Sequence, residues 1–280
     1  MKNEIAIGQT QELQIKKAKN QLSTVFSLIQ SDEAIRLVNI LKRIETDKGI
    51  EFLCSFENIN WSVELIEKYK DQWHWFYLSR NTSLPWSIEL FEKYKDQWDW
   101  SYLSSNTSLP WSIELFEKYK DQWHWGGLSR NTSLPWSIEL FEKYKDQWDW
   151  RGLSSNTALP WSIELIEKYK DQWDWDLGGL SGNTALPWSI ELIEKYKDQW
   201  HWEELSSNTS LPWSIELIEK YKDQWDYWGE LSRNTSLPWS IELIEKYKDQ
   251  WDWLELSWNE SIHWPKLSIN MVDEIMQYNQ

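Results

Sequence analysis

The fold is decided by one stretch of sequence, Trp86-Ser-Ile-Glu-Leu-Phe-Glu-Lys-Tyr-Lys-Asp-Gln-Trp-Asp-Trp-Ser-Tyr-Leu-Ser-Ser-Asn-Thr-Ser-Leu-Pro110. Near-identical copies of this stretch occur eight times, and they begin at Trp61, Trp86, Trp111, Trp136, Trp161, Trp188, Trp213 and Trp239. Successive copies start 25 residues apart, except for one step of 27 and one of 26. A fixed period in this range is typical of a solenoid, in which each repeat packs only on its neighbours.

Each copy is expected to begin with a helix. Ser87 is suited to the N-cap, because its hydroxyl can accept a hydrogen bond from a backbone N–H two or three residues on. The apolar residues that follow are spaced by three or four and so share one face: Ile88, Phe91, Tyr94 and Trp98. This spacing predicts a long first helix of about three turns. A second frame, with Ser83 as the cap and Pro85 in the first turn, is also compatible with the sequence.

A short second helix is expected in the rest of the copy. Asp99 can cap it, and Asn106 is suited to a left-handed stop, with Pro110 soon after it. Helices of this length are marginal in water on their own, so each copy must bury its Trp, Leu and Ile side chains against the next copy. The sequence therefore predicts an all-α fold, an α-solenoid of stacked long-helix and short-helix repeats with helical caps.

The first part of the chain, residues 1–60, holds no Trp and differs in composition from the copies. A shift of 25 residues aligns residues 36–60 with the first copy and puts Ile50 under Trp75. We interpret residues 36–60 as a degenerate copy. Together with an amphipathic helix expected at residues 12–30, it forms an N-terminal helical cap, because repeat arrays need atypical ends.

The eight copies occupy residues 61–263, and residues 264–280 are interpreted as a C-terminal cap. Trp264 fits two registers: the first Trp of a new copy, or the Trp of a Trp-x-x-Leu-Ser-x-Asn motif that ends at Asn270. In either register an amphipathic helix can close the array with the apolar residues Met271, Ile275 and Met276. The three parts are expected to form one continuous solenoid body.

Two copies are longer than the others. The fifth copy carries two additional residues around Asp176 and Leu177, and the seventh carries one near Tyr227. Both additions lie at the start of the expected second helix. We therefore expect a loop or bulge to absorb them there.

The composition limits the partners and the compartment. A net charge of −16 argues against nucleic acid and against an anionic membrane surface, since both favour basic proteins. The single cysteine, Cys54, allows no internal disulfide and fits a reducing compartment. Residues 1–13 lack the apolar core of a signal peptide, and no apolar run approaches the length of a membrane span. We expect a cytoplasmic protein.

Two motifs of the copies carry a resemblance: Leu-Ser-x-Asn-x-x-Leu-Pro-Trp-Ser-x-Glu-Leu and Asp-Gln-Trp-Asp-Trp. They resemble the Trp-rich tandem repeats of roughly 25 residues found in bacterial proteins and in large DNA viruses. The resemblance covers residues 61–263. It implies a helical repeat array, and it brings no assigned activity and no catalytic residues.

No catalytic, metal or cofactor site is expected. His74, His124 and His201 fall at the N-cap of the expected second helix. The first two are two copies apart, about 20 Å at 8–10 Å for each packed helix layer, which is too far to share a metal ion. Glu and Asp recur in near-identical settings in every copy, so no pair stands out as an acid–base couple. The sequence therefore predicts a protein that is not an enzyme and holds no cofactor.

The copies differ mainly at three positions: the two residues before Leu-Ser and the one after it. On a short helix these offsets share a face, so stacking turns them into a stripe along the solenoid. Aromatic and Arg side chains dominate protein contacts, which gives the candidate partner-binding residues Phe76, Tyr77, Arg80, Tyr102, Arg130, Arg151, Arg233 and Trp258. Drift at exposed positions is the alternative interpretation of the same variation.

The expected function is that of a non-enzymatic repeat scaffold that binds a protein partner through this stripe. Two alternatives stay open. The array can be purely structural and associate end to end with other copies of itself. Exposed Trp rings can also bind glycans, although Trp at helical spacing in a repeat is more often part of the core.

Overall fold

The computed structural model describes residues 32–225 and 228–278. All regular elements within these two ranges are helices, and pairs of helices repeat in sequence order. The chain is therefore an all-α solenoid. Its contacts divide it into two compact units, and the division falls between Asp99 and Trp100. That the array forms one continuous body stays a prediction.

The first unit starts with a helical segment at residues 32–41. The helices that follow it are α2 (Thr46–Ser55), α3 (Val63–Lys68), α4 (Trp75–Arg80) and α5 (Ile88–Lys93). α2 packs on α4, and the Asn81 side chain donates to the Cys54 carbonyl oxygen at 2.8 Å. α2 therefore stands to α4 as one second helix stands to the next. The helix expected at residues 12–30 lies outside the described residues.

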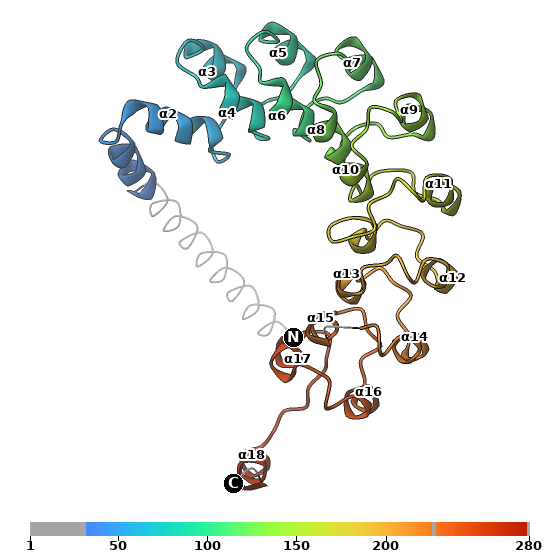
Figure 1. The fold of residues 1–280 in the computed structure, drawn as a ribbon. Helices are drawn as coiled ribbons and strands as arrows, with labels where there is room; N and C mark the ends of the chain where they lie inside the picture. The colour runs from blue at the N-terminus through green and yellow to red at the C-terminus, as the bar shows by residue number, and fades with distance from the viewer. Residues whose placement is uncertain (1–31, 226–227, 279–280) are drawn as a thin grey trace, which may run out of the picture. The chain divides into compact units, whose positions relative to one another are not determined.

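The second unit holds two rows of helices (Figure 1). One row contains the first helices of the copies: α7 (Ile113–Lys118), α9 (Ile138–Lys143), α11 (Ile163–Lys168), α12 (Ile190–Lys195), α14 (Ile215–Lys220) and α16 (Ile241–Lys246). The other contains the second helices: α6 (Trp100–Ser105), α8 (Trp125–Arg130), α10 (Trp150–Ser154), the 3-10 helix η1 (Leu180–Gly182), α13 (Trp202–Ser207), α15 (Trp228–Arg233) and α17 (Trp253–Trp258). Neighbours in this second row pack directly on one another, as α6 does on α8.

The first helix of each copy begins where the sequence predicts but is shorter. Ser87 is the N-cap of α5, and its hydroxyl accepts from the backbone N–H of Leu90 at 3.2 Å. The alternative frame with Ser83 as the cap is wrong, because residues 82–83 lie in a turn. The predicted length of three turns is also wrong. α5 ends at Lys93, because the Trp98 indole N–H donates to the Phe91 carbonyl at 3.0 Å and caps the last turn.

The second helix begins after the predicted N-cap position, which His124 occupies in α8 and Asp252 in α17. The predicted left-handed Asn at its end is wrong. Asn131 has extended φ and ψ values of −76° and 112°, and no residue other than Gly has a positive φ in the described ranges. The Asn side chain is instead buried and bound to the preceding copy, which requires an extended backbone at this position.

The two additional residues of the fifth copy are absorbed where the sequence predicts. They replace the α-helical turn by a turn that leads into η1. Gly178 takes a positive φ of 76°, and a Cβ on Gly179 would lie 2.1 Å from the backbone oxygen of Asp174. Only glycine fits these two positions. The additional residue of the seventh copy lies outside the described residues.

The core between copies is built from three Trp positions, called here the first, second and third Trp of a copy; in the second copy they are Trp86, Trp98 and Trp100. The second Trp is the most buried, with Trp123 only 4 % exposed. Its ring lies 4.9 Å from the first Trp of its own copy, Trp111, and 4.7 Å from the third Trp of the copy before, Trp100. The Trp123 indole N–H donates to the Phe116 carbonyl at 3.0 Å. Each ring therefore packs on neighbours without leaving its polar atom unpaired.

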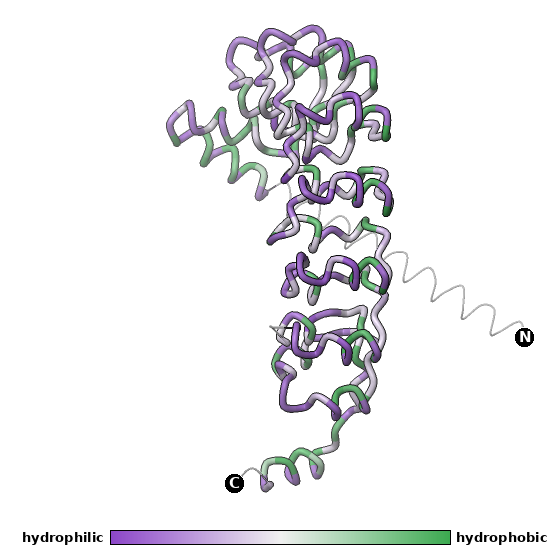
Figure 2. Tube along the Cα trace, turned by 45° about the vertical axis from the view of Figure 1, so that its right-hand side comes forward, coloured by the Kyte–Doolittle hydropathy of each residue, from purple (hydrophilic) through white to green (hydrophobic). Residues whose placement is uncertain are grey.

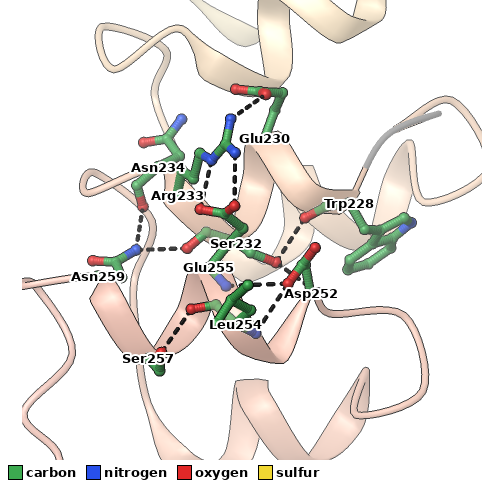
Figure 3. Close-up of polar contacts among 10 residues, drawn as sticks. All are labelled: Trp228, Glu230, Ser232, Arg233, Asn234, Asp252, Leu254, Glu255, Ser257 and Asn259. Atoms are coloured by element: carbon green, nitrogen blue, oxygen red, sulfur yellow. Dashed lines mark hydrogen bonds and ion pairs between the residues drawn. The ribbon is translucent and has the colours of Figure 1, made fainter.

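A polar ladder joins consecutive second helices. The Ser129 hydroxyl donates to the Trp125 carbonyl at 2.7 Å and accepts from the Asp149 N–H at 2.9 Å. The Asn131 amide donates to the carbonyls of Ser104 at 2.9 Å and Asn106 at 3.3 Å. Figure 3 shows the same bonds at the end of the array, where Asn259 contacts Ser232 and Asn234. The repeated Leu-Ser-x-Asn motif is therefore the bonding unit between copies.

The chain leaves the array at Trp264. The backbone N–H of Trp264 donates to the Ile262 carbonyl at 3.0 Å, as the first Trp does in each copy, and Trp264 follows Asn259 by the usual five residues, which selects the new-copy register. Its indole N–H differs, because it donates to the Leu256 carbonyl at 3.2 Å and not to the Asn carbonyl. In the copies a capping Ser follows this Trp directly, whereas here Ser268 comes only after Pro265, Lys266 and Leu267. The helix that follows, α18 (Ile269–Tyr278), contains the predicted apolar residues but has no buried residue. It therefore does not cover the last copy.

Candidate functional site

The predicted stripe is only partly a surface. Phe76 and Trp258 expose 44 % and 65 % of their surface. The four Arg residues of the stripe are also exposed: Arg80, Arg130, Arg151 and Arg233. Tyr77 and Tyr102 are half-buried. In most copies the outer two positions of the trio face solvent, although Gly229 in the seventh copy is buried, and the middle position is half-buried or buried in every copy.

Glycines at the middle position show how close that packing is. A Cβ on Gly127 would lie 2.9 Å from the Cβ of Ser104, and a Cβ on Gly152 would lie 3.0 Å from the Cβ of Ser129. These distances are at or below the limit that real Cβ atoms reach, so the helices α6, α8 and α10 approach through glycine. The size of the residue at the middle position therefore limits how closely neighbouring second helices can approach.

Three Arg residues of the stripe pair with an acid of the following copy. Arg130 contacts Asp149 at 3.1 Å, and Arg151 contacts Asp174 at 3.4 Å. Arg233 grips both carboxylate oxygens of Glu255 at 2.6 Å and also contacts Glu230 (Figure 3). The first two ion pairs are largely exposed and screened by solvent, so each adds little stability, whereas the Glu255 side chain is only 13 % exposed and is held by two bonds. In each pair the Arg side chain already binds an acid of the next copy, so it joins two copies and is less available to a partner.

Two exposed Trp residues lie together on α17, the last second helix. Trp253 is 54 % exposed, Leu254 60 % and Trp258 65 %. The third Trp of the seven earlier copies is half-buried or buried, because a following copy covers it. Trp228, for example, lies 5.1 Å from Tyr247 and 4.8 Å from Trp251 of the next copy. No such copy follows Trp253, and the sequence prediction missed this residue although the end of the repeat was visible.

A shallow pocket of about 300 Å³ lies beside Trp258. It is lined by Arg233, Thr235, Glu255, Trp258, Asn259 and Glu260. α18 follows, with Ile269 80 % and Met276 61 % exposed, and Figure 2 shows its apolar residues in green near the C-terminus. Apolar side chains are therefore concentrated at the C-terminal end of the second unit.

A second kind of pocket recurs between copies. One such pocket, of about 300 Å³, is lined by Lys70, Asp71, Trp73, Trp75, Tyr94 and Gln97. Another, of about 340 Å³, is lined by Glu194, Lys197, Asp198, Trp202, Lys220, Tyr221, Asp223 and Gln224. Lys197, Asp198, Trp202, Tyr221 and Gln224 stand at the same repeat positions as Lys70, Asp71, Trp75, Tyr94 and Gln97. The array thus repeats one shallow site with aromatic, carboxylate, amide and ammonium groups.

Charge and aromatic groups are coupled beside these pockets. Glu67 accepts from the Tyr94 hydroxyl and pairs with Lys93 at 2.5 Å. The hydrogen bonds from Lys93 and then from Tyr94 lower the pKa of Glu67 to about 2. Burial and then the Glu67 carboxylate raise the pKa of Tyr94 to about 12. The same trio recurs as Glu117, Lys143 and Tyr144, so it belongs to the repeat and not to one reactive site.

Within residues 32–225 and 228–278 no group of three or more His, Cys, Asp or Glu side chains could hold a metal ion. No helix of the described part is both long and apolar enough to cross a membrane. No protein-family model, curated protein or solved structure matches this chain.

Proposed function

We propose that this chain is a non-enzymatic repeat scaffold that binds a protein partner, and that its main contact surface is α17. One observation carries the proposal: Trp253, Leu254 and Trp258 each expose more than half of their surface on a single six-residue helix. The second Trp of the copies, in contrast, is packed between neighbours, as in Trp251 at 4 % exposed. Large exposed rings at one end of the array are the kind of residue that dominates protein contacts.

The surroundings of α17 suggest the chemistry of the partner. The two rings and Leu254 supply an apolar centre, and the exposed Glu260 supplies a carboxylate at its edge. An interface of this kind favours a partner with apolar side chains flanked by Lys or Arg. Among the other stripe residues, we give a secondary contact role to Phe76 and not to the Arg residues that already join copies.

We also propose a cytoplasmic location. Cys54 is buried, and this burial raises the pKa of its thiol to about 11. Cys54 is the single cysteine of the chain and can form no internal disulfide, which supports a reducing compartment.

A photo-crosslinking residue at position 254 tests the proposal in cells of the source organism. The expected result is one or a few defined adducts that mass spectrometry identifies, and their loss when Trp253 and Trp258 are both changed to Ser. The matched control is the same crosslinker at Glu203, the exposed equivalent of Leu254 two copies earlier. Equal adducts from both positions, or none from position 254, would contradict the proposal.

The repeated pockets favour a second candidate function, glycan binding. Trp75 and Tyr94 supply aromatic surface, and Asp71 and Gln97 supply acceptors and donors for sugar hydroxyls. A glycan array with the full chain tests this candidate. The variant Gln97→Ala should weaken glycan binding at this pocket. It should leave the fold intact, because Gln97 is exposed. An empty array would remove the candidate.

A further inference from the structure

The first interface of the array lacks a ring that the next interface contains. Within the first unit, the third Trp of the first copy, Trp75, packs on Tyr94 at 4.6 Å and on Trp98 at 4.7 Å. One copy earlier, Ile50 of α2 stands at the position of Trp75. An isoleucine side chain is smaller than an indole, so this interface is filled less completely.

A mostly apolar pocket of about 370 Å³ lies at this place, the largest of the pockets described above. It is lined by Ile50, Leu53, Ile59, Leu65, Tyr69, Gln72 and Trp73. Leu65, Tyr69 and Trp73 are half-buried. Their counterparts one copy later are covered: Leu90 is 2 % exposed, Tyr94 7 % and Trp98 4 %. The residues that line this pocket therefore correspond to those that surround the Trp75 indole one copy later, but Ile50 stands in place of the indole.

The other end of the same chain carries the matching group. Trp253 is the third Trp of the last copy, and 54 % of it is exposed because no further copy covers it. Its indole N–H already donates to the Lys248 carbonyl at 3.0 Å. The outer part of the ring therefore needs only an apolar surface, and burying it costs no hydrogen bond.

We propose that the occupant of the Ile50 pocket is the Trp253 ring of a second copy of this chain. This inference rests on the proposed role of α17 as a protein-contact surface and names the partner. The contact joins different surfaces of two identical chains, so it is heterologous, and each pair of chains keeps one unused pocket and one unused Trp253 ring. Association is therefore open-ended and grows with concentration. The net charge of −16 opposes it, so added salt should strengthen it by screening.

Sedimentation velocity of the full chain over a concentration series tests the proposal, with two variants. Trp253→Ala removes the donor ring at a mainly exposed position, so the fold should remain. Ile50→Trp fills the pocket from within, and its melting temperature should be at least that of the wild type. We expect both variants to sediment as monomers under conditions in which the wild type associates. Phe52→Trp is the matched control, because it adds an indole to the same helix at an exposed position and should associate like the wild type.

Mixing the two variants provides the sharpest test. Trp253→Ala keeps the pocket and Ile50→Trp keeps the donor, so their mixture should form a one-to-one dimer and nothing longer. N-acetyltryptophanamide should dissociate that dimer, and N-acetylleucinamide should not.

Unchanged association in Trp253→Ala, or a mixture that stays monomeric, would overturn the inference. A wild-type chain that stays monomeric at all concentrations and ionic strengths would also overturn the inference. This holds if the pocket binds N-acetyltryptophanamide, and it holds if residues of the same chain cover the pocket. Adducts of other proteins at position 254 would in that case leave the proposed function standing. The two failures are therefore distinguishable.

Discussion

At the residue scale, Asn and Ser join the copies through hydrogen bonds in addition to the packing of the Trp rings. Asn131 is 1 % exposed, and its amide makes two bonds to the preceding copy, while its side-chain oxygen accepts from the Ser133 N–H at 2.9 Å. All polar atoms of this side chain are thereby used on backbone groups. Such residues are costly to remove, because the backbone groups stay buried and lose their partners.

Asn131→Ala is expected to destabilise the protein by about 2–3 kcal/mol, since it leaves backbone groups unpaired in a buried place. Urea unfolding followed by circular dichroism measures the change. Thr132→Ala is the matched control at the exposed neighbouring residue, where we expect a change within about 0.5 kcal/mol. Similar small effects in both variants would mean that water can replace the Asn amide.

The Trp residues should divide sharply into core and surface. Trp123→Ala is expected to cost about 3–5 kcal/mol, because the ring is 4 % exposed and lies between Trp100 and Trp111. Trp258→Ala should cost less than about 0.5 kcal/mol, because the ring is 65 % exposed. The same unfolding measurement compares the two variants. A large loss for Trp258 would show that α17 is packed and would count against its role as a contact surface.

At the element scale, both helices of a copy are short, and their ends depend on side-chain caps. The Ser137 hydroxyl caps α9 by accepting from the Leu140 N–H at 3.1 Å, and the Trp148 indole caps its last turn by donating to Phe141 at 3.0 Å. The second helices are capped less uniformly. His124 accepts from the Gly127 N–H at 3.1 Å, whereas Asp149 makes no capping bond and its carboxylate contacts Arg130.

Ser137→Ala should therefore destabilise the protein by about 1 kcal/mol, the usual cost of losing an N-cap hydroxyl. Thermal melting followed by circular dichroism measures the loss. Ser133→Ala is the matched control four residues earlier, because the fourth and fifth copies carry Ala158 and Ala185 at that position. Equal losses in the two variants would mean that the Ser137 bond contributes nothing specific.

At the scale of the whole molecule, the Glu–Lys–Tyr trio sets a pH window for stability. The trio recurs in both units, so the titration of one position is repeated along the chain. The pKa of Glu67 is lowered from 4.5 to about 2 in the folded chain, so its contribution is present above pH 4.5 and disappears as the pH falls toward 2. The pKa of Tyr94 is raised from 10.0 to about 12, so its contribution is present below pH 10 and disappears as the pH rises toward 12.

The melting temperature should therefore be highest between about pH 5 and 9 and fall on both sides. Scanning calorimetry over a pH series measures it. Glu67→Gln should lower the melting temperature near pH 7, and its difference from the wild type should shrink as the pH falls from 4.5 to 2. A constant difference across that range would show that the carboxylate charge of Glu67 does not stabilise the fold.

The sequence by itself determined the architecture. The 25-residue period, the three Trp positions and the Ser before each first helix are local signals that repeat, and repetition turned weak helix propensities into a firm prediction of an all-α solenoid. The same period aligned Ile50 with Trp75 and located the two additional residues around Asp176. These features depend on spacing along the chain, which sequence displays directly.

Only the tertiary structure decided what each repeated side chain binds. The Asn of Leu-Ser-x-Asn was predicted to end a helix through its own backbone, whereas its amide reaches carbonyls about 25 residues earlier in the chain. Three Arg residues of the stripe likewise pair with acids of the following copy, a contact that spacing along the chain does not display. Exposure of Trp253 and the hollow beside Ile50 also depend on whether a neighbouring copy is present, because burial in a solenoid comes from the next layer and not from the residue's own sequence.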